Sequence, residues 1–343
     1  MQYSELNINN YRGIKKCHLQ DLNLVNLFFG KNNCGKSSLL EAIYILSKPS
    51  EPIAPLIVNN FRMLAGSQEE NIKIDFYQAN PKNAINISSD GDEKRQISIS
   101  MIESHSKEVT LDQLDAIGNE NVGKHYGLKL SFSTSHDDNE HTSKVIINEG
   151  QTGKIIKDKN YVESIPSGFI PSTRLHGNLN EMLVDIIKNK KENDIIEALR
   201  VVEPRIKDIQ LVDNSIMVDV GFATRLPINV LGDGVRKLLS IILAIHSCAN
   251  GILMIDEIDN GLHFSVLKNM WKVIFATCKE YNVQLFATTH SIDVIKSLVQ
   301  VINTDDVPIA AYKLLKKEDD ELIALHYEAK NLSYAVEQEI EVR

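Results

Sequence analysis

The sequence predicts an α/β protein built on a mixed or parallel sheet that helices cover on both faces. In the last third of the chain, apolar runs such as GILMIDE (251–257) and VQLFATTH (283–290) alternate with longer helical patterns, which is typical of parallel strands joined by helices. Near the start, FFGKNNCGKSSLLEA (28–42) places a glycine-bracketed polar loop between a strand pattern and a helix pattern. Between 50 and 165, short alternating runs are divided by Asn, Asp and Gly, which predicts an antiparallel β-rich insertion.

The first fifty residues predict strands, a loop and a helix in that order. YSELNIN (3–9) and CHLQDLNLVNLFF (17–29) alternate as strands do, and Asn10 and Gly13 mark a turn between them. The helix that follows the polar loop begins near Lys36 and ends by Leu46, before Pro49.

The segment after the insertion predicts a strand and polar turn in SGFIPSTR (167–174), and then regular elements to about residue 315. The predicted helices cover 179–189, 194–202, 235–248, 264–279 and a stretch ending near 299. The predicted strands cover 206–213, 215–221, 251–257, 283–290 and 309–315. We therefore expect a discontinuous domain, 1–49 and 166–343, with a helical subdomain at about 175–250 and an insertion at 50–165.

Composition and charge limit the kind of partner. The 343 residues carry a formal net charge of −9, so DNA could be bound only through a local basic patch and not by bulk attraction. The four cysteines have no paired spacing, which favours a reducing, cytoplasmic setting. The longest apolar stretch, 235–245, contains two basic residues and a serine, so we expect no membrane span and no membrane partner.

The polar loop matches the spacing GxxxxGK[ST] through Gly30, Gly35, Lys36 and Ser37. In such a loop the backbone amides wrap phosphates, the lysine reaches the terminal phosphates and the hydroxyl offers an oxygen to Mg²⁺. A glycine-rich turn without a ligand is the alternative, but the flanking strand and helix are those that a nucleotide site needs. The sequence predicts ATP and Mg²⁺ as cofactors. The expected nucleotide contacts in this loop are Gly30, Asn32, Asn33, Cys34, Gly35, Lys36, Ser37 and Ser38.

Two acids end a buried strand pattern at Asp256 and Glu257. Asp256 would bind the metal together with Ser37, and Glu257 would take a proton from the attacking water. His290 ends the next strand, at the edge where open α/β sheets bind ligands, and its ring could donate to the γ-phosphate. A strand that happens to end in two acids, and a structural histidine, are the alternatives. We assign catalysis to Lys36, Glu257 and His290.

A second glycine-rich segment, NVLGDGVRKLL (229–239), precedes a strongly apolar helix. Gly232, Asp233 and Gly234 would present the helix amides to an anion, whereas a plain turn is the alternative. Because the chain already has one phosphate loop, this second anion site fits a nucleotide held by another copy of the chain.

The order of these pieces resembles the ABC-type ATPase heads, and among them the RecF-like and OLD-like (overcoming lysogenization defect) branch. That order is phosphate loop, glycine-led helix, ILMIDE (252–257), IDNGLH (258–263) and ATTHS (287–291), and the opening LNINNYRGIKKCHL (6–19) is similar too. The resemblance covers roughly 1–48 and 167–343. It implies a P-loop ABC-type fold and a head-to-head homodimer, or a higher even-numbered oligomer, around two ATP molecules. The partner copy would supply 232–234, and Asp259 would lie where the chains cross.

The sequence departs from the family pattern at three points, and each changes what we expect of its activity. The LSGGQ-type segment is LGDGV here, so Gly232 replaces a serine, backbone amides are left to bind the phosphate, and slow hydrolysis is expected. The glutamine loop is not evident, and Ser172 or Arg174 in FIPSTR (169–174) lies nearest to its position. About fifty residues follow His290 without the acidic cluster of a TOPRIM nuclease, so we do not expect this chain to cut DNA itself.

The function that the resemblance implies is an ATP-hydrolysing switch. Dimerisation on ATP would control a separate effector protein, such as a nuclease, or a DNA transaction, in anti-phage defence or genome maintenance. The alternatives are a scaffold that binds nucleotide without hydrolysis and the ATPase subunit of a transporter. The large β-rich insertion disfavours the transporter, and the lack of an NKxD-type guanine-reading motif disfavours a GTPase.

Three weaker signals have simpler interpretations. HDDNEH (136–141) is interpreted as a solvated hairpin tip more readily than as a metal site, and KNKKEN (188–193) as the solvated end of a helix more readily than as a DNA contact. Arg12, in the first turn, could reach nucleotide or DNA, or form a surface ion pair.

Overall fold

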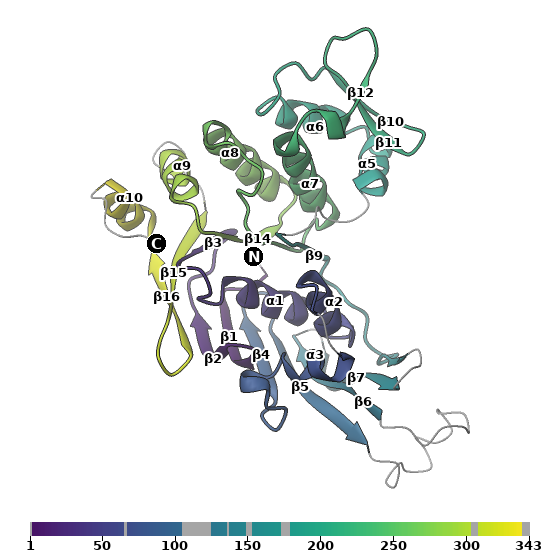
Figure 1. Cartoon of the computed structure of the whole chain (residues 1–343), viewed down its shortest axis with the longest axis vertical. Coiled ribbons are helices and arrows are strands. Elements are labelled where there is room, and N and C mark those ends of the chain that lie inside the picture. The colour runs from purple at the N-terminus through teal and green to yellow at the C-terminus, as the bar shows by residue number, and fades with distance from the viewer. Residues whose placement is uncertain are drawn as a thin grey trace.

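One large mixed sheet organises the molecule, and helices lie against both of its faces (Figure 1). A computed structural model gives this structure and describes residues 2–64, 67–104, 125–135, 137–148, 153–172, 179–302 and 308–337. The strands of the sheet are β1 (Glu5–Tyr11), β2 (Ile14–Leu19), β3 (Val25–Phe29), β4 (Ile85–Asp90), β5 (Arg95–Ser104), β6 (His125–Thr134), β7 (Asp137–Asn148), β8 (Lys154–Ile156), β9 (Ser167–Ile170), β13 (Ile252–Ile255), β14 (Gln284–Thr289), β15 (Ile309–Lys316) and β16 (Glu321–Tyr327). Their order in the sheet is β8-β7-β6-β5-β4-β1-β2-β16-β15-β3-β14-β13-β9.

The remaining elements are helices and one small sheet. The helices are α1 (Lys36–Ser47), α2 (Ala54–Phe61), α3 (Gln68–Lys73), α5 (Leu179–Lys188), α6 (Glu192–Leu199), α7 (Asp233–Ser247), α8 (Phe264–Glu280), α9 (Ile292–Ile302) and α10 (Ala329–Glu337), with 3-10 turns η1 (Tyr77–Ala79) and η2 (Ile228–Val230). The small antiparallel sheet is β10 (Asp208–Val212), β11 (Ser215–Asp219) and β12 (Leu226–Pro227). The predicted helical region at about 175–250 therefore also contains this sheet.

The parallel part of the large sheet positions the site. Strands β9, β13, β14, β3 and β15 are neighbours in this order and run parallel. Along β3, Leu27 and Phe29 belong to the core under α7, α8 and α9, whereas Phe28 belongs to the core around α1. Alternate side chains are therefore buried on opposite faces, which explains why these strands are apolar throughout.

The other half of the sheet is mostly antiparallel. Strand β15 turns back into β16, which lies parallel to β2, and β1 then pairs with β4. Strands β4 to β8 follow one another antiparallel and so extend the same sheet. The predicted β-rich character of the middle third is confirmed for these strands. The division of the chain into a discontinuous domain and an insertion stays a prediction.

The structure corrects several predicted elements. The segment 17–29 forms the end of β2 and the whole of β3 instead of one strand, because Asp21 has a left-handed φ of 57° that breaks the ladder. Within the stretch expected to be β-rich, Ala54–Phe61 and Gln68–Lys73 form the helices α2 and α3 instead of strands, and Tyr77–Ala79 forms a 3-10 turn. Their sequence signals are a proline in the first turn of α2 and a capping box between Ser67 and Glu70 at the start of α3. Strand β16 and helix α10 were not predicted.

No helix among the described residues is long and apolar enough to cross a membrane.

Candidate active site

The polar loop between β3 and α1 has a backbone that only small or flexible residues adopt easily. Gly30, Asn33 and Gly35 have φ angles of 149°, 63° and 103°. A Cβ on Gly30 would lie 2.6 Å from the carbonyl oxygen of Leu314 in β15, closer than two such atoms can approach. Strand β15 therefore packs directly against the loop. Glycine is required at position 30 for two reasons: it adopts this φ angle easily, and any side chain would collide with Leu314.

The ammonium group of Lys36 is hydrogen-bonded to backbone carbonyls of its own loop. Lys36 Nζ donates hydrogen bonds to the carbonyl oxygens of Gly30 and Lys31, both at 2.9 Å. Cys34 is buried, whereas Asn32 and Asn33 are exposed. The ammonium group therefore lies at the concave side of the loop, where a phosphate would replace carbonyl oxygens as its partner.

Strands β3, β13 and β14 bring Ser37, Asp256 and Thr288 together at one edge of the sheet. Ser37 Oγ donates to Asp256 Oδ2 at 2.9 Å, and Thr288 Oγ1 donates to Asp256 Oδ1 at 2.6 Å. The same Thr288 oxygen accepts a hydrogen bond from the backbone N–H of Glu257 at 2.9 Å. Asp256 and Thr288 are buried, so this chain of bonds fixes both acids. Sequence reasoning missed Thr288, although it immediately precedes Thr289 and His290 in the motif that was recognised.

Glu257 and His290 face each other beyond this cluster. His290 Nδ1 lies 3.7 Å from Glu257 Oε1, and both side chains are partly exposed to solvent. Glu257 has a left-handed φ of 51°, a strained conformation for a residue with a long side chain. The side chain of Glu257 is 39% exposed, so a water molecule can reach its carboxylate.

The segment after Glu257 is tied to the strand that carries His290. Thr289 Oγ1 donates to Asp259 Oδ1 at 2.7 Å, and Asn260 Nδ2 donates to the carbonyl oxygen of Ser172 at 3.0 Å. Ser172 therefore lies beside this segment through its backbone. Arg174, the other candidate for the missing glutamine loop, lies outside the described residues.

The glycine-led start of α7 is open to solvent. A Cβ on Gly232 would meet no atom within 4 Å, and the side chain of Asp233 is 80% exposed. Gly234 packs against Gly261: a Cβ added to Gly234 would lie 3.5 Å from the carbonyl oxygen of Gly261. The start of α7 therefore lies at the surface of the chain, next to the segment that follows Glu257. Apolar side chains flank this edge, since Val230 and Phe264 are both 65% exposed.

A buried lysine lies behind these groups. Lys237 of α7 is almost fully buried, and burial lowers its pKa, while the nearby carboxylates of Asp256, Asp259 and Glu257 oppose that shift. One positive charge of the chain therefore already faces the acids of the site.

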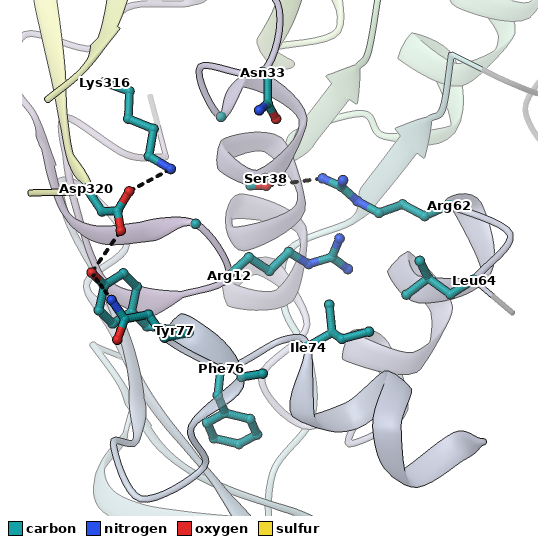
Figure 2. Close-up of a pocket in the computed structure, with 14 residues that line it drawn as sticks. Arg12, Asn33, Ser38, Arg62, Leu64, Ile74, Phe76, Tyr77, Lys316 and Asp320 are labelled. Atoms are coloured by element: carbon teal, nitrogen blue, oxygen red, sulfur yellow. Dashed lines mark hydrogen bonds and ion pairs between the residues drawn. The ribbon is translucent and has the colours of Figure 1, made fainter. Parts of the chain in front are cut away.

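A pocket of about 400 Å³ adjoins the phosphate loop (Figure 2). Asn33, Gly35 and Ser38 of the loop and α1 form one wall. The other walls come from the turn between β1 and β2, the segment around α2 and α3, and the turn between β15 and β16. Its remaining lining residues are Arg12, Gly13, Arg62, Leu64, Ile74, Phe76, Tyr77, Gln78, Ala79, Lys316 and Asp320. Apart from Arg12, sequence reasoning treated none of these as a candidate site residue, because the segment around α2 and α3 and the turn between β15 and β16 carry no recognised motif.

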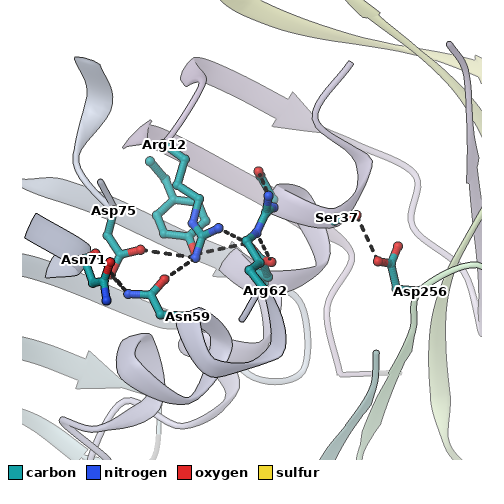
Figure 3. Close-up of polar contacts among 10 residues, drawn as sticks. Arg12, Ser37, Asn59, Arg62, Asn71, Asp75 and Asp256 are labelled. Carbon is teal, nitrogen blue, oxygen red and sulfur yellow. Dashed lines mark hydrogen bonds and ion pairs between the residues drawn. The ribbon is translucent and has the colours of Figure 1, made fainter. Parts of the chain in front are cut away.

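A buried charge cluster joins this pocket to the phosphate-loop helix (Figure 3). Arg12 lies 3.2 Å from Glu41 of α1 and 3.2 Å from Asp75, and it also hydrogen-bonds Asn59. Arg62 donates to Glu41 at 2.7 Å and to Ser38 Oγ at 3.1 Å. The expectation of a surface ion pair for Arg12 is wrong, because its side chain is buried in the cluster.

Burial sets the protonation of the cluster. It raises the pKa of the Asp75 carboxyl to about 7, although Arg12 and a hydrogen bond from Asn59 act in the opposite direction. The carboxylates of Glu41 and Asp75 help to raise the pKa of Arg12, against the effect of its burial. The guanidinium group of Arg12 is therefore charged at any ordinary pH.

The other two weaker signals, at 136–141 and 188–193, lie away from this site. His141 is buried, its ring stacks on Phe132, and its Nδ1 lies 3.0 Å from Asp158. The expected hairpin is present, since β6 and β7 pair antiparallel and Asn139 and Glu140 near the start of β7 are exposed. His141 is not part of its solvated tip, and His136 lies outside the described residues. Lys191, in the basic run, bonds Tyr281 Oη at 2.6 Å.

The residues 25–296 match the family described as "AAA domain, putative AbiEii toxin, Type IV TA system". This segment runs from the start of β3 into α9 and includes the phosphate loop, the start of α7, both acids and His290. The chain belongs to this family.

Other comparisons agree with this assignment. This chain is 28% identical over 369 residues to an "ATP/GTP phosphatase" of Helicobacter pylori, and the match covers 97% of this chain and 97% of the relative. A stretch of 47 residues is 47% identical to the "DNA replication and repair protein RecF" of Pseudoalteromonas translucida and covers 14% of this chain and 13% of that protein.

Comparison with solved structures identifies the fold of this chain. An SMC head bound to the C-winged helix domain of ScpA matches with a TM-score of 0.51 at 11% identity, over 96% of this chain and 98% of that one. An SMC head with an extended coiled coil, bound to the C-terminal domain of ScpA derived from Pyrococcus furiosus, matches with a TM-score of 0.51 at 10% identity, over 98% and 99%. The fold is that of an SMC-like ABC-type ATPase head, and the family supports ATPase activity.

Proposed function

We propose that this protein is an ATP-hydrolysing switch that closes head-to-head around two nucleotides. The observation that carries the proposal is the position of the start of α7. Gly232 lies open at the edge of the chain, beside the segment that contains Asp259, and no side chain among the described residues caps the helix there. A nucleotide held by the phosphate loop of a second copy would supply an anion at this helix start.

The donor groups of the site fit ATP with Mg²⁺. Ser37 Oγ and Asp256 Oδ2 are 2.9 Å apart, and a hydroxyl and a carboxylate are the oxygen ligands that Mg²⁺ accepts beside nucleotide phosphates. Among the described residues no group of three or more His, Cys, Asp or Glu side chains could hold a metal ion, so this pair would hold the ion together with the phosphates. When bound, Mg²⁺ supplies charge neutralisation for the phosphate oxygens.

The protein's own residues divide the work of hydrolysis. Lys36 would leave its two loop carbonyls and bind the terminal phosphates, while the loop amides orient them. Glu257 would accept the proton of the attacking water, since its carboxylate is accessible and its backbone is fixed by Thr288. His290, 3.7 Å from Glu257, would donate to the γ-phosphate.

Closure of the dimer would be coupled to ATP because the closed dimer binds ATP more tightly than the open chain does. The phosphate loop is present in the open chain, whereas the α7 amides meet a phosphate only in the dimer. ATP therefore binds the closed form more tightly and shifts the population toward it. The exposed Val230 and Phe264 beside this edge would be covered in the same step.

The output of the switch would be a separate effector protein, such as a nuclease, or a DNA transaction. We place the protein in the OLD-like branch of these ATPases, in a cytoplasmic role in phage defence or genome maintenance. The RecF-like stretch and the family description, which names a putative toxin of a toxin–antitoxin system, support a role of this kind.

Mixing two inactive variants tests whether each nucleotide site is formed by the loop of one copy and the start of α7 of the other. Lys36→Ala removes the phosphate-binding cation and leaves α7 intact, whereas Gly232→Glu puts a negative charge at the α7 edge and leaves the loop intact. Each variant alone should lose most ATPase activity. Their mixture should regain activity, because one site of each heterodimer combines an intact loop with an intact α7. Thermal unfolding of each variant confirms folding, and a mixture no more active than its two components would refute the proposal.

Glu257→Gln separates hydrolysis from nucleotide-dependent scaffolding. We expect its turnover to fall by about 100-fold or more, while light scattering in ATP and Mg²⁺ shows accumulated dimers. Glu280→Gln, a substitution in an exposed ion pair with Lys191, should leave turnover unchanged. A Glu257→Gln protein that hydrolyses ATP normally would contradict the assignment of the general base.

A further inference from the structure

The far wall of the pocket beside the phosphate loop carries a linked set of polar side chains. Tyr77 Oη donates to Asp320 Oδ2 at 2.9 Å, and Lys316 Nζ lies 2.8 Å from Asp320 Oδ1. Gln78 Nε2 donates to Tyr77 Oη at 3.0 Å. Figure 2 shows Asp320 between Lys316 and Tyr77, across the pocket from Arg62. The set therefore joins the η1 turn to the turn between β15 and β16.

The backbone under Asp320 is fixed. Its carbonyl oxygen accepts a hydrogen bond from the backbone N–H of Lys15 at 3.0 Å, and its own N–H donates to the carbonyl oxygen of Lys317 at 3.1 Å. Its φ is 63°, a left-handed value that aspartate tolerates better than most residues. The carboxylate is thus positioned by the turn and is not the end of a mobile side chain.

The same groups remain within reach of a ligand. The side chain of Asp320 is 31% exposed and that of Lys316 is 35% exposed. Asn33 and Gly35 of the phosphate loop line the same cavity. A nucleotide whose phosphates lie in the loop could therefore extend its base into the pocket, whose volume is in the ordinary range for ligand sites.

A carboxylate next to an ammonium group matches the edge of guanine. Guanine presents the acceptor O6 beside the donors N1–H and N2–H₂, so a carboxylate can accept two hydrogen bonds while an ammonium group donates to O6. Adenine offers only its N6–H₂ donor on that edge and one ring acceptor beside it. Asp320 with Lys316 would therefore satisfy guanine fully and adenine in part.

We propose that Asp320 reads the base of the bound nucleotide and that the pocket accepts GTP at least as well as ATP. This inference rests on the proposed nucleotide site at Lys36 and names the base that the site takes. Asp320, from the turn between β15 and β16, would take the role that the aspartate of an NKxD-type motif has in guanine recognition. Lys316 and Tyr77 hold its carboxylate in place.

The test compares the affinities of the two nucleotides by isothermal titration calorimetry in Mg²⁺. Asp320→Asn removes the charge but keeps an acceptor for Tyr77 and tolerates the left-handed backbone. The ratio of GTP to ATP affinity should fall by about tenfold in this variant, because a good bidentate contact to a base gives discrimination of this order. Glu321→Gln is the matched control, since Glu321 pairs with Lys317 at 3.0 Å in the same hairpin but does not line the pocket.

A second variant keeps the test decisive if Asp320→Asn does not fold. Lys316→Met removes the donor to O6, since methionine has a side chain of similar length without an N–H group, and it should lower the same ratio. An unchanged ratio in the folded variants, or wild-type protein that binds ATP but not GTP, would overturn the inference.

Lys36→Ala distinguishes the failure of this inference from the failure of the proposed function. If Lys36→Ala loses both nucleotides while Asp320→Asn keeps the wild-type ratio, only the base reading is wrong. If both nucleotides still bind to Lys36→Ala, the proposed nucleotide site is itself wrong.

Discussion

The hydroxyl of Ser37 donates a hydrogen bond to Oδ2 of Asp256 at 2.9 Å, although 219 positions separate the two residues in the chain. Ser37 follows β3 and Asp256 follows β13, and β14 lies between these parallel strands. Their carboxyl ends therefore meet at one edge of the sheet. The two proposed metal ligands are already in contact before any ion binds.

Replacement of Ser37 by alanine should weaken the response to Mg²⁺. We expect the Mg²⁺ concentration for half-maximal ATPase activity to rise by about tenfold, because one of two protein oxygens is lost from the ion. Titration of Mg²⁺ at fixed ATP measures this shift. Ser47→Ala is the control, since Ser47 Oγ donates only to the carbonyl oxygen of Tyr44 at the far end of the same helix. Equal Mg²⁺ dependence in the two variants would contradict the metal assignment.

Replacement of Thr288 by valine should reduce both stability and turnover. The hydroxyl is buried and bonds Asp256 and the N–H of Glu257. Its loss leaves the buried carboxylate oxygen and the partly buried N–H without this partner, which costs about 1–3 kcal/mol. Urea unfolding and ATPase assays measure the two effects. Thr288→Ser should restore both, because it keeps the hydroxyl.

Thr277→Val provides the comparison for Thr288. The Thr277 hydroxyl donates only to a carbonyl of its own helix, that of Val273, at 2.8 Å. A Thr288→Val protein as active as Thr277→Val would show that Thr288 does not position the acids.

Asp75 should make stability depend on pH in a defined direction. Burial raises its pKa from 3.8 to about 7, so between these values the folded protein binds more protons than the unfolded chain. The contribution of Asp75 to stability is therefore fully present below about pH 4 and is lost as the pH rises through 7. The free energy of unfolding should fall between pH 5 and pH 8 more steeply in the wild type than in Asp75→Asn.

A control for the pH experiment is available at Asp90. This exposed carboxyl pairs with Lys94, which lowers its pKa, so it does not titrate above pH 5. Asp90→Asn should keep the wild-type slope between pH 5 and pH 8. Equal slopes for the wild type and Asp75→Asn would refute the shifted pKa of Asp75.

The sequence predicted the phosphate loop and the acids because their chemistry is encoded in short stretches. Gly30, Gly35 and Lys36 have fixed spacing, and Asp256 follows an apolar strand. Their meeting at one edge follows from the geometry of parallel strands. The structure adds the bonds that hold them, of which Thr288 is the clearest case, since a threonine in an apolar strand fits the strand equally well without a polar partner.

The pocket and the buried charge cluster could not be predicted in this way. Arg12, Glu41 and Asp75 come from a turn, a helix and a loop whose contact depends on how α2 and α3 pack. No local pattern distinguishes a buried arginine from an exposed one, and an isolated charged residue is exposed in most proteins. Asp320 was missed for a related reason, since KEDD (317–320) has the composition of any exposed turn.

The contact between Gly30 and Leu314 has a consequence for the synthesis of the protein on the ribosome. Strand β3 lies between β14 and β15, so the strand that carries the phosphate loop gains both neighbours only after residue 316 has left the exit tunnel. When the loop and Lys36 have been synthesised, β15, against which the loop packs, has therefore not yet been made. Nucleotide binding by this protein should therefore begin only after β15 has emerged from the ribosome, well after the loop itself.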